Sequence, residues 1–376
     1  MLINQIFEID SCDDVELNIK RTSKLEYRIS YDDEKEMKAI VFIIGGYGAN
    51  ANIYFLDSYR NYIAKNFDVV AVHVFYHCFC QRRSDVEKYS AFTIFTKDDV
   101  SNLSQVLLEI GVNINVNLEN AQQCYELLNQ NITTLKLQGK LVQNYQAKFT
   151  STIIPPNGDY QNYGIMAALD HINALKDLVK RFPKFADLPK IYGGGSYGGY
   201  LSLLIAKIAP WYVDGVIDNS GSALPPLIYI LGRESGECDY FEEYPHNKIG
   251  FFIRTYWNAD VSSKYFFHTE NYLIRIIPNL AHLTIQANVN KNIVLVSYHS
   301  LKDPFNTAKD KQTLFLAYKE LGYDATLHLI KDESEIDGRF IKDLNHGMRI
   351  SDKALFRKEL PLMLEKLQKR KSLMQE

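Results

Sequence analysis

The chain has no run of apolar residues long enough to cross a bilayer, although 46% of its 376 residues are hydrophobic. A membrane-spanning helix needs about 20 consecutive apolar residues. The N-terminus, MLINQIFEIDSCDD, also lacks a basic segment followed by an apolar core of signal-peptide length. We therefore expect a soluble, cytoplasmic protein without a membrane partner, built as one catalytic domain with a substantial core.

An excess of charge of one sign is also missing. Lys and Arg number 42 and Asp and Glu number 45, which gives a formal net charge of −3. Such a balance produces no long-range field for phosphate backbones, and we expect no nucleic-acid partner.

Cysteine is scarce, with five residues and no CxxC pair, which favours reduced thiols. The neighbouring His77, Cys78 and Cys80 would form only part of a soft-metal site, because two further ligands at suitable spacing are not evident. We expect neither a metal nor another cofactor.

The most informative feature that is present is KIYGGGSYGGY at 190–200, in which Ser196 lies between Gly194 and Gly198. A GxSxG pattern is typical of a nucleophilic serine on a tight strand-to-helix turn, where a side chain two positions away on either side would collide with backbone. The apolar run at 188–192 predicts the strand, and YLSLLIAKI at 200–208 predicts a buried helix. A glycine-rich loop that only packs a helix against a sheet is the alternative.

A serine nucleophile needs a general base, and the base needs a carboxylate that orients it. Asp303 follows a strand expected at 292–298, and His346 follows a strand expected at 325–330 and a polar loop. This order of serine, acid and histidine predicts a catalytic triad of Ser196, Asp303 and His346.

Other residues compete for these roles. Asp218 follows the strand expected at 213–217 and is an alternative acid, and Asp303 could instead be a turn former before Pro304. His299 and His328 lie within or against strands, where a lone histidine is more often structural than a base.

An oxyanion hole needs two backbone NH donors. Tyr197, at the start of the helix after the serine, is one candidate. The second is Tyr47 in the GGYG turn that follows the strand expected at 39–44, where Gly46 permits the turn. A dinucleotide-binding turn is the alternative for this loop, but no GxGxxG pattern follows.

With these motifs the chain resembles the α/β-hydrolases over residues 39–360, and its GGYG turn resembles the HGxG loop of esterases and prolyl-oligopeptidase-like enzymes, with Gly45 in place of the histidine. More narrowly, PPNGDYQNYGIMAALDHINAL together with GGSYGGY resembles a family of hydrolase-like proteins from Campylobacter and related bacteria. The resemblance implies an α/β-hydrolase fold, with a mostly parallel central sheet flanked by helices. Alternating residues at 1–38 add antiparallel N-terminal strands.

Two insertions are expected within this single domain of residues 1–376. The polar stretch 98–149 has helical spacing and predicts a helical hairpin, through which the chain would contact another copy if it forms an oligomer. The stretch 222–290 is rich in aromatic residues and is expected to be a cap that shields the site and stacks on sugar rings. Each of its three arginines, at 233, 254 and 275, is expected at the surface, although a clamp for a substrate carboxylate is an alternative.

These features favour a serine hydrolase that forms an acyl-enzyme from a small-molecule ester, with an acyl group on a carbohydrate or a related metabolite as its substrate. Acyl transfer to a sugar acceptor is an alternative, because the same acyl-enzyme would serve both reactions. An aminopeptidase-like hydrolase, with Glu237, Glu242 and Glu243 holding a substrate amino group, is another. The third is a catalytically silent scaffold that binds a partner.

Overall fold

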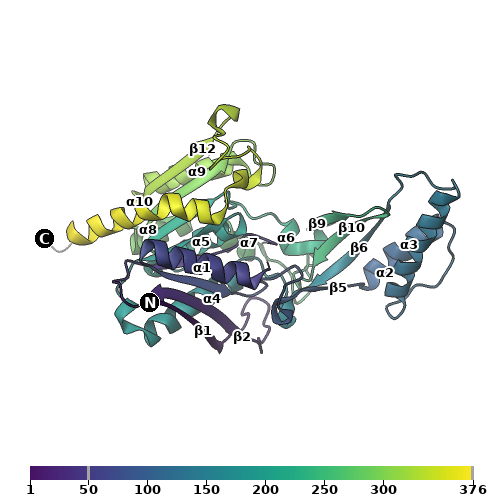
Figure 1. The fold of residues 1–376 in the computed structure, drawn as a ribbon, viewed down its shortest axis with the longest axis horizontal. Coiled ribbons are helices and arrows are strands. Elements are labelled where there is room, and N and C mark those ends of the chain that lie inside the picture. The colour runs from purple at the N-terminus through teal and green to yellow at the C-terminus, as the bar shows by residue number, and fades with distance from the viewer. Residues whose placement is uncertain (49–50, 374–376) are drawn as a thin grey trace. The chain divides into compact units, whose positions relative to one another are not determined.

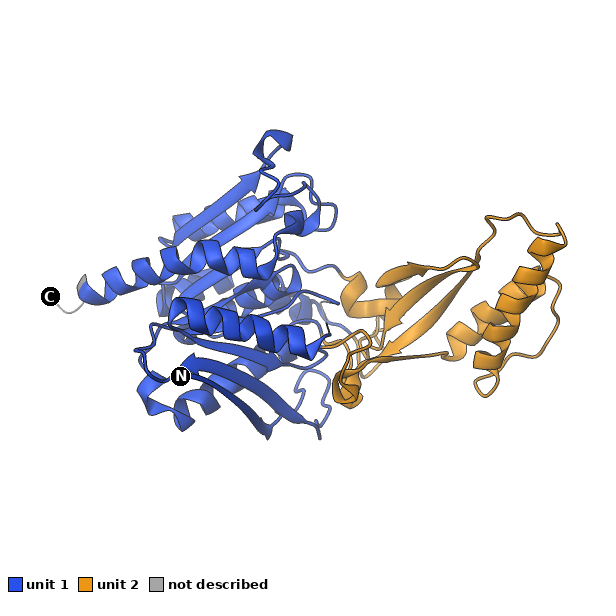
Figure 2. Ribbon diagram, viewed as in Figure 1, with its two compact units in different colours: residues 1–79, 163–226, 267–376 blue, residues 80–162, 227–266 orange. Residues whose placement is uncertain are grey.

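The computed structural model describes residues 1–48 and 51–373. It consists of two compact units, which are coloured separately in Figure 2. Unit 1 comprises residues 1–79, 163–226 and 267–376, and unit 2 comprises residues 80–162 and 227–266. The chain therefore leaves unit 1 twice and returns to it twice.

Unit 1 is built on an eight-stranded sheet with the strand order β1-β2-β4-β3-β7-β8-β11-β12. The β1–β2 and β2–β4 pairs are antiparallel, and all the following pairs are parallel. The strands are β1 (Leu2–Asp10), β2 (Lys24–Asp32), β3 (Ile40–Ile43), β4 (Val70–Phe75), β7 (Lys190–Gly195), β8 (Gly215–Asn219), β11 (Val294–Ser300) and β12 (Asp324–Ile330). This mostly parallel sheet with antiparallel N-terminal strands confirms the predicted α/β-hydrolase fold.

Helices cover both faces of this sheet, as the parallel connections require. In Figure 1, α1 and α10 run side by side over the strands. On the other face, α5 packs against β7 and β8 and contacts both α4 and α8. The helices of unit 1 are α1 (Ile53–Phe67), α4 (Ile165–Arg181), α5 (Tyr197–Ile208), α7 (Thr269–Arg275), α8 (Leu280–Val289), α9 (Ala308–Glu320) and α10 (Asp352–Leu373).

The core beneath α1 and α10 follows the alternation of side chains along the strands. Alternate residues of β11, at 294, 296 and 298, join one buried cluster with Val41 of β3 and with Phe356 and Leu360 of α10. The strands β3, β4, β8 and β11 are buried along their whole length. Because both faces of these strands are covered, β3 (IVFI) and β4 (VAVHVF) are nearly continuous apolar runs, whereas β8 and β11 begin apolar and bury polar residues toward their ends.

Unit 2 contains a four-stranded sheet with the order β5-β6-β10-β9, in which β6 and β10 are parallel and the outer pairs are antiparallel. Its elements are β5 (Phe92–Ile94), α2 (Lys97–Glu109), α3 (Ala121–Leu137), β6 (Ala147–Ile154), α6 (Ile228–Leu231), β9 (Tyr240–Glu243) and β10 (Asn247–Ile253). On one face of this sheet, Asp99 of α2 accepts hydrogen bonds from Thr150 and Thr152 of β6.

The stretches that the sequence singled out as insertions overlap this unit in part. Apart from Lys97, the first residue of α2, the helices α2 and α3 lie within 98–149, and they contact one another. The stretch 222–290 contains strands β9 and β10 in unit 2 and helices α7 and α8 in unit 1. Its function as a cap, and the division of the chain around it, stay predictions. Among the described residues, no helix is both long and apolar enough to span a membrane.

One buried ion pair ties α9 to the centre of the sheet. Lys311 Nζ of α9 donates to Asp218 Oδ2 of β8 at 2.6 Å, and both side chains are almost completely buried. The same carboxylate accepts from the Ser297 hydroxyl at 2.6 Å and from the Gly221 NH at 2.8 Å. A buried charge with this many partners is satisfied only while all of them are in place.

We expect Lys311→Met to destabilise the protein by about 3–5 kcal/mol, because Asp218 would keep a buried charge without its cation. Urea unfolding followed by circular dichroism measures this. The matched control is Lys369→Met, which removes an exposed lysine paired with Glu365 and should leave the unfolding midpoint unchanged. Equal midpoints for the two variants would contradict the stabilising function of the buried pair.

Candidate active site

Ser196 lies on the turn between β7 and α5 with φ 54° and ψ −118°. A non-glycine residue at positive φ costs of order 1–3 kcal/mol and persists only where the surroundings hold it. Here the Ser196 NH donates to the Asn219 carbonyl at 2.7 Å, and the Ser196 carbonyl accepts from the Tyr200 NH at 3.0 Å. The strand before it and the helix after it therefore fix the turn.

The two glycines of the GxSxG pattern are required by one neighbouring atom. A methyl group at Gly194 or at Gly198 would lie 1.9 Å from the carbonyl oxygen of Ile44, at the end of β3. Side-chain Cβ atoms essentially never come within 3.0 Å of a non-bonded atom. The steric reason for the predicted motif therefore holds at both positions.

The structure brings Ser196, His346 and Asp303 together in one hydrogen-bonded chain. His346 Nδ1 lies 2.8 Å from Asp303 Oδ2, and His346 Nε2 lies 2.7 Å from Ser196 Oγ. Since an ionised carboxylate only accepts hydrogen bonds, Nδ1 carries the proton and Nε2 is left to accept from the serine hydroxyl. This is the protonation state in which a histidine can act as a general base toward a serine.

The side chain of Asp303, in the loop after β11, is fully buried. Burial raises the pKa of its carboxyl, but the hydrogen bond from His346 and those from the backbone NH groups of Phe305 and Asn306 outweigh it, so the pKa lies below its ordinary value. The two backbone bonds measure 2.9 and 3.1 Å. Asp303 is therefore ionised at neutral pH.

The loop that carries His346 is held by the neighbouring strand ends. His346 begins a short 3₁₀ turn, His346–Arg349, in which Gly347 has φ 74°. The Gly347 NH donates to the Ser220 hydroxyl at 3.2 Å, and its carbonyl accepts from Asn219 Nδ2 at 3.1 Å. The Phe305 ring meets the imidazole edge-on, with centroids 5.3 Å apart. The ring orientation is therefore fixed from several sides.

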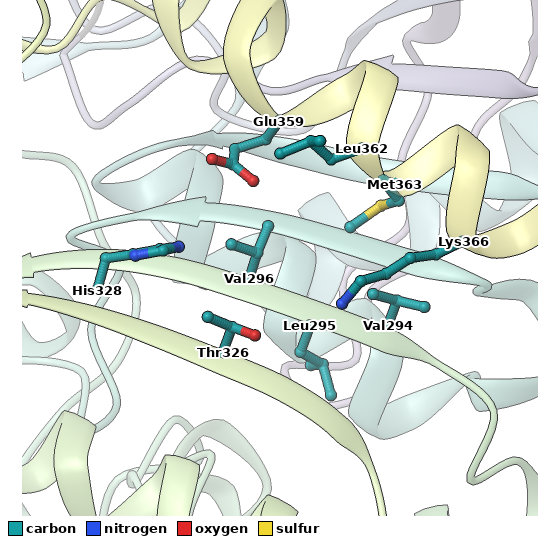
Figure 3. Close-up of a pocket in the computed structure, with 9 residues that line it drawn as sticks. All are labelled: Val294, Leu295, Val296, Thr326, His328, Glu359, Leu362, Met363 and Lys366. Atoms are coloured by element: carbon teal, nitrogen blue, oxygen red, sulfur yellow. The ribbon is translucent and has the colours of Figure 1, made fainter.

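The competing residues have other partners. Asp218 binds Lys311, Ser297 and the Gly221 NH, as described above. His299 Nε2 lies 3.0 Å from the Asn306 carbonyl and 3.8 Å from Asp303, so it packs behind the acid. His328 stacks on Tyr298 with centroids 4.4 Å apart. It faces a separate pocket of about 180 Å³ between β11, β12 and α10, which Figure 3 shows.

The loop predicted to carry the second oxyanion donor lies against the serine turn. A methyl group at Gly46 would be 3.2 Å from the Gly195 carbonyl oxygen and 3.4 Å from Ser196 Cβ. The rings of Tyr47 and Tyr197 meet edge to face with centroids 5.8 Å apart. Tyr197 is the first residue of α5, where backbone NH groups have no partner within the helix. The oxyanion function of Tyr47 and Tyr197 stays a prediction.

Several charged residues of 222–290 form ion pairs within the protein. Arg275, expected at the surface, is instead fully buried and forms two hydrogen bonds of 2.7 and 2.8 Å with Glu16. Arg233 pairs with the buried carboxylate of Asp99. Glu243 pairs with Lys248 at 2.8 Å. Among the residues that the structure describes, no cluster of three potential metal ligands is found.

Sequence reasoning missed Asp352, the first residue of α10. Its carboxyl lies directly behind the serine turn, since a methyl group at Gly195 would be 3.2 Å from Asp352 Oδ1. Burial raises the pKa of this carboxyl to about 6, although the Gly195 NH stabilises the ionised form. An acidic residue at a helix N-terminus is common, so the sequence offered no signal that this one is special.

Comparison with known protein families adds a family membership. Residues 5–376 match the model of the family described as "Protein of unknown function (DUF2920)". The chain belongs to this family. The narrower resemblance to proteins from Campylobacter stays a prediction. No match was found among curated proteins.

Several solved structures resemble the chain at low identity. An acylaminoacyl peptidase from Pyrococcus horikoshii is 13% identical with a TM-score of 0.47, over 96% of this chain and 41% of that one. A putative dipeptidyl aminopeptidase IV from Bacteroides ovatus is 11% identical with a TM-score of 0.48, over 97% and 36%. This chain thus spans about two fifths of the length of these two proteins. A carboxyl esterase from Bacillus coagulans is 11% identical with a TM-score of 0.42, over 87% and 90%.

We expect Gly198→Ala to lower the free energy of unfolding by about 3 kcal/mol or more, because the added methyl group overlaps the Ile44 carbonyl and neither backbone can yield. Thermal unfolding measures it. The matched control is Gly322→Asn, at a position with φ 86° and open space around it, which asparagine tolerates. A Gly198→Ala variant as stable as the control would refute the steric argument.

Proposed function

We propose that this chain is a serine hydrolase that acts on an ester through an acyl-enzyme. The observation that carries the proposal is the unbroken hydrogen-bonded chain Asp303–His346–Ser196, with spacings of 2.8 and 2.7 Å. A serine, a base and an orienting acid at these distances are what nucleophilic catalysis at a carbonyl requires. The same spacings argue against a silent scaffold, which has no need to keep them.

The reaction follows from the positions of the protons. Ser196 Oγ attacks the ester carbonyl while His346 Nε2 takes its proton, and Asp303 stabilises the imidazolium that forms. In this proposal the backbone NH groups of Tyr197 and Tyr47 stabilise the negative charge that develops on the carbonyl oxygen. His346 then protonates the leaving alcohol, and a water molecule activated by the same nitrogen releases the acid.

We further propose a small acyl group on a carbohydrate or a related metabolite as the substrate. The support comes from unit 2 by itself, which has a groove of about 730 Å³ with a lining of the kind that binds carbohydrates. The groove is formed on one face of the sheet by cross-strand rows such as Ser151–Phe251–Tyr240. Its lining combines aromatic rings with the planar polar groups of Arg82, Gln122 and Glu242. Sugar rings bind well to such a surface, because their CH faces pack on aromatic rings while their hydroxyls bond to planar polar groups.

The nucleophile is tested by covalent labelling. A fluorophosphonate probe should label the wild-type protein and not Ser196→Ala. The matched control is Ser202→Ala, which removes a buried hydroxyl from α5 that donates to the Gly198 carbonyl, and which should label like the wild type. Equal labelling of Ser196→Ala and the wild type would refute the proposal.

Screening p-nitrophenyl esters from acetyl to octanoyl, and then acetylated sugars, identifies the substrate.

The acid is tested by a substitution that keeps its shape. We expect Asp303→Asn to lower kcat by about 10⁴, because the amide stabilises the wrong tautomer of His346 and cannot support the imidazolium. Rates are measured with the best ester from the screen. The control is Asp332→Asn, an exposed residue of the neighbouring loop, which should leave kcat unchanged. A loss below tenfold in Asp303→Asn would exclude Asp303 as the orienting acid.

A further inference from the structure

A second cavity lies in unit 1, between the start of α10, the helix α1 and the ends of β3 and β4. Its volume is about 320 Å³. None of the triad residues lines it. Its lining is mostly aromatic and aliphatic, with a few polar groups: Ile43, Gly45, Phe55, Leu56, Ser58, Tyr59, Tyr62, His73, Val74, Tyr76, Phe79, Ser351, Asp352 and Lys353. An apolar cavity with a small number of polar groups is the usual form of a small-molecule site.

Two of the polar groups are buried without a hydrogen-bond partner. Tyr59 is 7% exposed and His73 is 5% exposed, and neither Tyr59 Oη nor His73 Nδ1 has a partner among the described residues. The two rings are neighbours, with centroids 6.1 Å apart. Leaving a buried polar atom unpaired costs about 1–3 kcal/mol, so two of them in one cavity point to a ligand that pairs with them.

The third polar group is the carboxyl of Asp352. No ion pair joins it to a cation of the described part of the chain. Asp352 lines the same cavity as Tyr59. Burial raises the pKa of Tyr59 well above its ordinary value, and the charge of Asp352 raises it further. Burial lowers the pKa of His73 well below its ordinary value, and Arg60 and Arg28 lower it further, so this imidazole is neutral. The polar groups of the cavity thus include one anion, the Asp352 carboxylate, and a neutral imidazole, that of His73.

The aromatic walls favour a cation as well. Five aromatic residues line the cavity, at 55, 59, 62, 76 and 79. The faces of such rings attract cations. Tyr62 already shows this, because the Nζ of Lys353, the cationic residue of the lining, lies 3.9 Å from its ring centroid. A carboxylate within a set of aromatic rings is the composition of sites that bind ammonium groups.

We propose that this cavity binds a primary ammonium group carried on a small apolar or aromatic body. The three N–H bonds of an ammonium group match three acceptors, which are the Asp352 carboxylate, Tyr59 Oη and the Nδ1 of neutral His73. The apolar body would contact residues such as Leu56 and Phe79. The proposal does not rest on the proposed hydrolase activity, because it uses none of the triad residues.

Other ligand classes fit these groups less well. An anion would be repelled by Asp352, and a purely apolar molecule would leave all three acceptors unpaired. A divalent metal needs more oxygen ligands than one carboxylate and a phenol supply. An ammonium group satisfies the charge and the hydrogen bonds together.

Two structural connections link the cavity to the turn that carries Ser196. The Gly195 NH, which stabilises the Asp352 carboxylate, belongs to the residue directly before Ser196. Gly45, at the other side of the cavity, directly precedes Gly46 in the loop that packs against Ser196. A ligand in the cavity would therefore contact the 45–48 loop at Gly45 and would act on the serine turn through Asp352.

Isothermal titration calorimetry with the full-length protein tests the proposal. The probes are 2-phenylethylamine, 2-phenylethanol and phenylacetate, which share one ring and differ in the head group. We expect the amine to bind at pH 7.5 and the other two to bind at least about tenfold more weakly. Below about pH 6 the affinity for the amine should fall, because Asp352 becomes protonated.

Two variants assign the binding to this cavity. Asp352→Asn keeps the shape and should weaken amine binding about 10- to 100-fold, and Tyr59→Phe should weaken it about 3- to 10-fold. Ser196→Ala should bind the amine like the wild type, which separates this result from the proposed catalysis. Thermal unfolding confirms that each variant is folded. The proposal is overturned if the amine does not bind at millimolar concentration, or if Asp352→Asn binds it as tightly as the wild type.

The ammonium group that binds in the cavity could belong to the substrate of Ser196 or to a separate amine. Protection of Ser196 from fluorophosphonate labelling distinguishes them. A substrate amino group would place the bound amine in the path of the probe, so 2-phenylethylamine would slow labelling competitively with probe concentration. A separate ligand would not compete with the probe, so raising the probe concentration would not reverse any effect of the amine on labelling.

Discussion

The carbonyl oxygen of Ile44 occupies the space in which a side chain at residue 194 or 198 would otherwise lie. The hydrogen bond from the Ile44 NH to the Gly193 carbonyl, at 2.8 Å, holds the ends of β3 and β7 at this separation. One strand then turns into the loop at 45–48, and the other turns at Ser196. Because both turns begin at the same contact, the loop predicted to supply an oxyanion donor and the serine lie next to each other.

The positive φ of Ser196 needs further support, and the end of β8 supplies it. The Asn219 carbonyl accepts from the Ser196 NH, and the Asn219 side chain donates to the carbonyl of Gly347. One residue therefore holds both the strained serine and the loop that carries His346. Asp218, directly before it, is held by Lys311 from α9, so the buried ion pair supports the site without touching its chemistry.

The parts of the site that were predictable are those that chain order and local sterics determine. The glycines around Ser196 follow from the tight turn, and the order of serine, acid and histidine follows from the order of strands in the sheet. The burial of Arg275 was not predictable, because its partner Glu16 lies 259 residues away and leaves no local pattern. The strands β9 and β10 of unit 2 were missed for a related reason. The strand β10 pairs with β6, which precedes Ser196 in the sequence, whereas β9 and β10 follow Ser196.

Asp303 and Asp352 show how one residue type acquires two different properties near one serine. Burial raises the pKa of both carboxyls. Asp303 accepts hydrogen bonds from His346 and from two backbone NH groups, which more than offset burial, whereas Asp352 is stabilised by the Gly195 NH alone. Where the environments of two neighbouring carboxyls move their pKa values apart, the two groups usually have different functions. The ionised Asp303 is complete within the protein and can orient a base, while Asp352 has no ion pair with a cation among the described residues, which is the gap that the proposed ammonium group would fill.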